Sequence, residues 1–154
     1  MMYADDLASR VRALRDIDAN TDALVPLGGR LFDVVISAAG QRGHAAVAAV
    51  DAAQTYGCGP VIADVRRPWL YWLVPPGTTA RWEHHPYGVC VGAPAEIVVP
   101  ALTQRRPCGG AYWLRPCRGR LLVSPGALRR ALYAHQPRPT PHRSMREVLG
   151  AARH

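Results

Sequence analysis

The sequence predicts an α+β domain, in which a mostly antiparallel sheet of short strands is flanked by helices. The first observation behind this prediction is that the apolar residues occur in short runs, which Pro, Gly or Arg interrupt. The second is that segments with helical spacing occur near both ends of the chain and once between the strand-like runs. Several of these runs follow one another without a helix between them, which favours antiparallel pairing.

Three segments have the pattern of helices. Residues 3–14 carry apolar side chains at helical spacing, with acids near the start and arginines near the end, which suits the helix dipole. Residues 40–56 are rich in alanine, and Gly57 follows as a helix stop. A third helix is predicted to begin after Ser124, an N-cap residue followed by proline, and to continue to residue 134.

The remaining apolar runs predict strands. The run at 31–36 contains one acid, and the runs at 61–65 and 69–74 form a hairpin across a basic turn. Residues 16–29 combine Asp, Asn, Thr, Pro and two adjacent glycines, and we expect them to form a loop. Further short strands are expected at 88–91, 96–99 and 111–114.

We expect one domain at residues 1–135, because a chain of 154 residues can bury a core without disulfides or metal ions. Residues 136–154 are rich in Pro, Arg and His and are predicted to be a basic tail, with a short helix at 144–152. No apolar stretch approaches the roughly 20 residues of a membrane-spanning helix. The first ten residues carry acids where a signal peptide carries basic residues, so we expect a cytoplasmic protein without membrane contact. The oligomeric state stays open.

Arginine supplies all of the positive charge. The formal net charge is +8, and the 19 basic residues include no lysine. The abundance of Ala, Gly, Pro and Arg suggests a GC-rich coding sequence, which accounts for part of this basicity. Because the guanidinium group binds phosphate in a bidentate manner, nucleic acid is the acidic partner that the composition favours.

The sequence contains no self-sufficient catalytic or cofactor-binding motif. The patterns G-x-S-x-G, G-x-x-x-x-G-K-[ST], H-E-x-x-H and G-x-G-x-x-G are all missing. We therefore expect neither a cofactor nor a bound metal ion.

The cysteines lack a C-x-x-C pair, and in a reducing compartment we expect them to be unpaired thiols, mostly in the core. They are Cys58, Cys90, Cys108 and Cys117. A zinc site is the less favoured alternative, with ligands from Cys108, Cys117 and the pair His84–His85.

Five segments form a wider pattern, which covers about half of the chain. They are FDVV at 32–35, YWLVPPG at 71–77, YGVCVG at 87–92, EIVVP at 96–100 and GGAYWLRP at 109–116. In their order and spacing these segments resemble the N-terminal domain of bifunctional DNA primase/polymerases, a branch of the archaeo-eukaryotic primase superfamily. The resemblance implies a primase/polymerase-like, RRM-like core.

At the positions that the resemblance makes catalytic, this chain has other residues. Asp33 matches the first of the family's acids, but Val35 stands at the second acid, Trp69 at the histidine and Cys90 at the third acid. Nucleotidyl transfer of this kind needs two divalent cations, and Mg²⁺ requires several oxygen ligands. The resemblance therefore implies a non-catalytic domain, a pseudoenzyme that keeps the scaffold without the polymerase chemistry.

The resemblance also implies a basic groove for a nucleic-acid backbone. Arginines in the turns between predicted strands are the candidates for non-specific nucleic-acid binding: Arg66, Arg67, Arg81, Arg105, Arg106, Arg115, Arg118 and Arg120. Interleaved aromatic residues can stack on bases. Alternation along the strands turns about half of them inward, however.

Two other functions stay open. The first is a protein-interaction or regulatory module on the same scaffold, in which the arginines are only a solvated rim. The second is a small-molecule enzyme in which Cys58, Cys90 or Cys108 acts as a nucleophile beside a histidine. Salt-dependent DNA binding separates nucleic-acid binding from the first, and sensitivity of an activity to thiol alkylation identifies the second.

Overall fold

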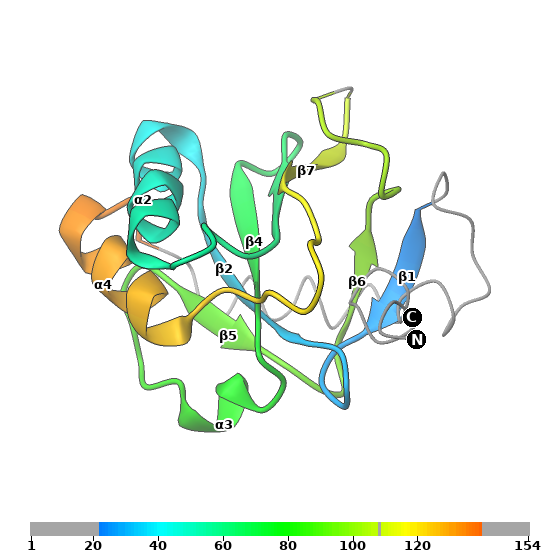
Figure 1. Cartoon of the computed structure of the whole chain (residues 1–154), viewed down its shortest axis with the longest axis horizontal. Coiled ribbons are helices and arrows are strands. Elements are labelled where there is room, and N and C mark those ends of the chain that lie inside the picture. The colour runs from blue at the N-terminus through cyan, green and yellow to red at the C-terminus, as the bar shows by residue number, and fades with distance from the viewer. Residues whose placement is uncertain (1–21, 108, 140–154) are drawn as a thin grey trace.

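The computed structural model describes residues 22–107 and 109–139, and within them two antiparallel sheets and three helices form an α+β fold, as predicted (Figure 1). The expected helices at 3–14 and 144–152 lie outside the described residues. In the part of the chain that is described, no helix has both the length and the apolar character needed to cross a membrane.

The larger sheet has five strands in the order β5-β2-β4-β3-β7, and each strand is antiparallel to its neighbours. These strands are β2 (Asp33–Ala38), β3 (Val61–Asp64), β4 (Trp69–Val74), β5 (Val89–Val91) and β7 (Ala111–Arg115). The smaller sheet pairs β1 (Ala23–Pro26) with β6 (Glu96–Val99). The helices are α2 (Gly40–Ala53), α3 (Thr78–Arg81) and α4 (Pro125–His135).

The topology of the larger sheet is that of a split βαβ unit. Both β2 and β3 are antiparallel to β4, which lies between them, so they are parallel to each other and α2 is the crossover that connects them. β5 then returns to the other side of β2. Between β4 and β5 the chain has only the short helix α3, and α4, which follows β7, packs beside α2 (Figure 1).

Alternation along the strands gives the sheet two apolar faces. One face packs against α2 and α4 and includes Val35, Leu70 and Trp72. The other face packs against β1 and β6 and includes Val34, Ile36 and Leu73. Burial on both faces explains why β2 and β4 appear in the sequence as nearly continuous apolar runs.

The expectation of a loop at residues 16–29 is wrong for β1. Ala23 and Val25 are buried while Leu24 is exposed, so the strand alternates, but over only four residues. Pro26 ends it, and proline is tolerated in a strand that pairs on one side only. The short strands expected at 88–91 and 96–99 are present, but β5 pairs with β2 whereas β6 pairs with β1.

Several other local predictions are confirmed, with shifted ends. The hairpin of β3 and β4 is present, and β2 begins and ends two residues later than the run from which it was predicted. α2 ends at Ala53, ahead of Gly57, whose φ is +86°. The Ser124 side chain caps α4 by accepting a hydrogen bond from the amide of Ala127 at 3.3 Å. α3 was not expected, because one helical turn has too few residues to show periodicity.

Two helical glycines provide a paired test of this packing. A Cβ on Gly43 of α2 would lie 2.4 Å from the carbonyl oxygen of Ala38, which is backbone and cannot rotate away. We expect Gly43→Ala to lower the free energy of unfolding by about 1–3 kcal/mol. A Cβ on Gly126 of α4 meets only the Arg130 side chain at 3.5 Å, so Gly126→Ala should raise the free energy of unfolding, by up to about 1 kcal/mol. Urea denaturation measures both, and equal effects would contradict the packing described here.

Candidate nucleic-acid interface

Asp33, the acid that the family resemblance singles out, is buried at the start of β2, with 2% of its surface exposed. Its Oδ2 accepts hydrogen bonds from the amide of Gly77 at 3.0 Å, the amide of Thr79 at 2.9 Å and the hydroxyl of Thr79 at 2.7 Å. These donors belong to the turn that follows β4 and begins α3. The carboxylate therefore fixes a turn of this chain.

The structure brings three of the four family positions together. Val35 and Cys90 are paired across β2 and β5, and both are buried on the face that packs against the helices. The hydroxyl of Thr79 lies 3.5 Å from the sulfur of Cys90 and also contacts Asp33. Trp69 does not join them, because it lies at the opposite end of β4 and packs against the other face of the sheet.

The cysteine and histidine positions bear on the enzyme and zinc alternatives. Cys58 is 1% exposed, and burial, followed by the charge of Asp51, raises the pKa of its thiol to about 12. A thiol of this kind is not a nucleophile at neutral pH. Among the described residues, no three His, Cys, Asp or Glu side chains are placed to hold a metal ion. Cys108 lies outside the described residues.

His85 is fully buried and joins the segment before β5 to α4. Its Nδ1 accepts a hydrogen bond from the amide of Tyr87 at 3.1 Å, and its Nε2 lies 3.3 Å from the carbonyl oxygen of Arg129. Its ring also packs against that of Tyr133, with 4.0 Å between the centroids. These contacts give His85 a structural role.

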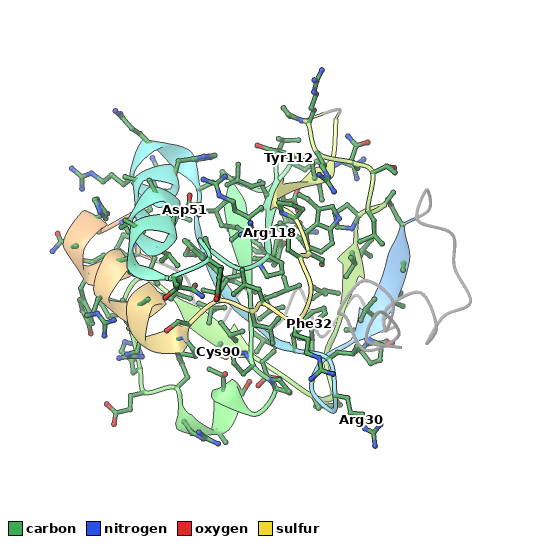
Figure 2. The ribbon with its side chains drawn as sticks, in the orientation of Figure 1. Arg30, Phe32, Asp51, Cys90, Tyr112 and Arg118 are labelled. Atoms are coloured by element: carbon green, nitrogen blue, oxygen red, sulfur yellow. The ribbon has the colours of Figure 1, made fainter. Side chains whose placement is uncertain are left out.

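Two of the eight candidate arginines tie the chain around β7 to the end of α2 (Figure 2). Arg115 donates from Nε to both carboxylate oxygens of Asp51, at 3.2 and 3.1 Å, and also from Nη2. Arg118 donates from Nη2 to the carbonyl oxygen of Tyr56 at 2.6 Å. The hydrogen bond from Arg115 lowers the pKa of Asp51, although burial opposes the shift.

Four other arginines form what we call the basic end of the sheet: Arg66, Arg67, Arg105 and Arg106, all of them exposed. The first two lie in the turn between β3 and β4, and the others lie in the loop that precedes β7. Arg66 joins the two segments, because its Nε donates to the carbonyl oxygen of Gly109 at 3.1 Å. Asp64 accepts hydrogen bonds from the amides of the turn and fixes its shape.

Arg81 lies far from the basic end. β4 begins just after the turn with Arg66 and Arg67 and ends just before the turn that leads to α3. Its six residues span about 20 Å. Arg30 lies at the same end as Arg81, because it precedes Asp33, which pairs with Val74 (Figure 2). Arg120 is exposed in the segment between β7 and α4.

Two clefts flank the turn between β3 and β4. The first lies between the two sheets and includes Arg66 and Arg67, but also the carboxylates of Asp22, Asp64 and Glu96. The second lies between the starts of β4 and α2 and is lined by Trp69, Arg42 and Arg138 together with alanines and prolines. Within residues 22–107 and 109–139, no carboxylate lines this second cleft.

The sequence did not single out Arg42 or Arg138. The position of Arg42 was nevertheless within reach of sequence reasoning. It follows a predicted strand and falls in the first turn of a predicted helix, so it lies at the end of the sheet where β4 begins. The position of Arg138 depends on a tertiary contact, which the sequence does not show. Arg42 donates to the carbonyl oxygen of Gln136 at 3.3 Å and so holds the chain after α4 near the start of α2.

Comparison of the chain with family models, with curated proteins and with solved structures gave no match. The candidate interface therefore rests on the residues and their geometry.

Substitution of Asp33 tests its role in the turn. Asp33→Ala removes the acceptor of two amides and a hydroxyl, so we expect the free energy of unfolding to fall by about 1–3 kcal/mol. Thr79→Ala is the matched control, because it removes only the hydroxyl donor and should cost about 1 kcal/mol or less. Urea denaturation measures both values. An Asp33→Ala protein as stable as the parent would show that the carboxylate does not hold the turn.

The pair of Asp51 and Arg115 predicts a dependence of stability on pH. The pKa of Asp51 is lowered in the folded state, so its contribution is present above the unfolded pKa of about 3.9 and is lost as the pH falls through the folded value. The parent should therefore melt at a higher temperature than Asp51→Asn near neutral pH, and the difference should shrink below about pH 4. Melting curves across this range measure the effect, with Glu83→Gln, an exposed position, as the control. A difference that persists unchanged at the lowest pH would contradict the ion pair.

Proposed function

We propose that this domain binds nucleic acid without catalysing a reaction on it, and that the basic end makes the contact with the phosphate backbone. The observation that carries the proposal is the meeting of two arginine-bearing segments at one end of the sheet. The hydrogen bond from Arg66 to Gly109 holds these segments together. Together they carry four exposed arginines at the end of the sheet where β3 ends and β4 begins.

The proposal agrees with the overall charge. A chain with a net charge of +8 attracts polyanions. Arginines clustered at one end should draw the polyanion to that end. Contacts to phosphate carry no sequence information, so we expect binding that does not depend on sequence. The dissociation constant should be about 10⁻⁴ to 10⁻⁶ M at physiological salt, as is typical of non-specific binding.

A non-catalytic role is supported by the surroundings of the family positions. The carboxylate of Asp33 is occupied by donors of the α3 turn, and its neighbours Val35 and Cys90 are buried side chains that cannot supply hard oxygen ligands. This is the arrangement expected of a primase/polymerase-like scaffold that has lost its metal site.

A protein-interaction module is the second candidate, and one observation favours it. Leu24 and Val98 face each other across β1 and β6, and they are 38% and 57% exposed. An exposed apolar pair on a two-stranded sheet is suited to contact with another protein. In that case the protein would not bind nucleic acid at low salt.

The proposal predicts that the basic end sets the salt dependence of binding. Each arginine that neutralises a phosphate releases counterions, so Arg105→Ala with Arg106→Ala should reduce the slope of log affinity against log salt by up to about two. The matched control is Arg30→Ala with Arg81→Ala, which removes the same charge from the opposite end of the sheet. Fluorescence anisotropy with labelled oligonucleotides at several salt concentrations measures both slopes.

If both double variants reduce the slope equally, binding is spread over the whole surface and the basic end is not the interface. If the folded, monodisperse parent protein binds neither single-stranded nor duplex probes at low salt, nucleic-acid binding is wrong and the protein-interaction module is favoured.

A further inference from the structure

Trp69 differs from the other tryptophans in its surroundings. Trp72 is fully buried and Trp113 is 2% exposed, so neither ring is accessible. Trp69 and Trp82 are both half-buried, and each has a guanidinium over its ring, that of Arg67 at 5.8 Å and that of Arg129 at 4.7 Å from the centroid. Trp82 lines a cleft with Arg81 and Arg129 at the end of the sheet away from the basic end. Trp69 lies at the start of β4 and lines the cleft next to the basic end, where the described lining residues include no carboxylate. Trp69 is therefore the partly exposed tryptophan that lies beside the basic end.

The walls of this cleft match the two chemical halves of a nucleotide. Ala38, Pro68 and Pro137 provide apolar surface around Trp69, and the cleft has a volume of about 580 Å³. Arg42 and Arg138 line the same cleft. Apolar walls with an aromatic ring suit the face of a base, and guanidinium groups suit the phosphate next to it.

The cleft is built by contacts between distant parts of the chain. Arg42 donates to the carbonyl oxygen of Gln136, which holds the chain that follows α4 against the start of α2. The amide of Ala39 donates to the carbonyl oxygen of Pro68 at 2.7 Å, which fixes α2 beside the turn of the basic end. The guanidinium of Arg67, which belongs to the basic end, lies over the Trp69 ring. The aromatic surface and the basic end are therefore adjacent.

The cleft between the two sheets is a poorer site for a polyanion. It shares Arg66 and Arg67 with the basic end, but Asp22, Asp64 and Glu96 also line it. Carboxylates beside a phosphate oppose binding. Of the two clefts beside the basic end, the one at Trp69 is therefore the better site for a polyanion.

We infer that the cleft at Trp69 takes an unpaired base of a single-stranded nucleic acid, with the base stacked on the indole ring and the neighbouring phosphates on Arg42 and Arg138. This inference rests on the proposed function and gives it a ligand class. In a duplex each base is stacked on its neighbours, so its face is not available to a protein side chain. The domain therefore prefers single strands to duplex.

The test compares three probes of equal length with the unaltered protein. They are a thymidine oligomer of about 12 nucleotides, a strand of the same length with abasic sugars, and a duplex. All three carry phosphates, but only the first offers unpaired bases. We expect the thymidine oligomer to bind about tenfold more tightly than the abasic strand, as stacking of one base allows, and to quench tryptophan fluorescence.

Two variants assign the effect to the cleft. Trp69→Leu should remove the preference for bases and the quenching while leaving the affinity for the abasic strand unchanged. Trp82→Leu is the matched control, since it replaces another half-buried tryptophan, which lies just after α3 at the opposite end of the sheet, and should keep the preference. Circular dichroism confirms that both variants fold. If Trp69→Leu does not fold, the comparison of probes with the unaltered protein still decides the question.

The outcomes separate the two proposals. Equal, salt-dependent binding of all three probes would overturn the stacking site and leave the basic end in place. A preference for bases that survives Trp69→Leu would place the base elsewhere and also overturn the inference. Failure of every probe to bind at low salt would remove the proposed function, and the inference with it.

Discussion

The structure depends on the central position of β4, which pairs with β2 on one side and β3 on the other. Its alternate residues serve both apolar faces of the sheet, and none of the five that follow Trp69 is more than 8% exposed. Trp72 is fully buried and satisfies its indole nitrogen through a 2.8 Å hydrogen bond to the hydroxyl of Ser37 on β2. Because β4 is paired on both sides and buried on both faces, it also positions the turns that precede and follow it. The basic turn comes before β4, and the turn held by Asp33 comes after it.

The two ends of the sheet show why an acid in a strand is weak evidence for catalysis. A buried carboxylate needs donors, and the turn after β4 supplies three of them to Asp33. These hydrogen bonds offset the cost of burying the carboxylate and at the same time hold the turn in place. Asp51 shows the same principle at the end of α2, where Arg115 and the amide of Cys58 are the donors. Both acids thus have partners within the fold, and most of these partners are distant in the sequence.

The sequence was sufficient for those parts of the fold that depend on neighbouring residues. The cap at Ser124 and the hairpin across Arg66 and Arg67 were predicted because their signals are local. β1 was missed because its partner β6 begins 70 residues after its last residue, counting from Pro26 to Glu96, and four residues give little periodicity. The sequence shows every arginine. It does not show which arginines bond within the fold and which stay exposed, because that depends on tertiary contacts. Only the fold makes Arg115 a partner of Asp51.

These separate roles make the composition a poor guide to the interface and the geometry a better one. Arg115 and Arg118 are used within the fold, and Arg81 lies at the opposite end of the sheet. What remains around the start of β4 combines two kinds of attraction with different physical behaviour. Guanidinium–phosphate contacts weaken as salt rises, whereas stacking on Trp69 depends little on salt. A domain with both would capture nucleic acid through charge and discriminate single strands through an uncharged contact, so the discrimination should persist at salt concentrations that weaken the total affinity.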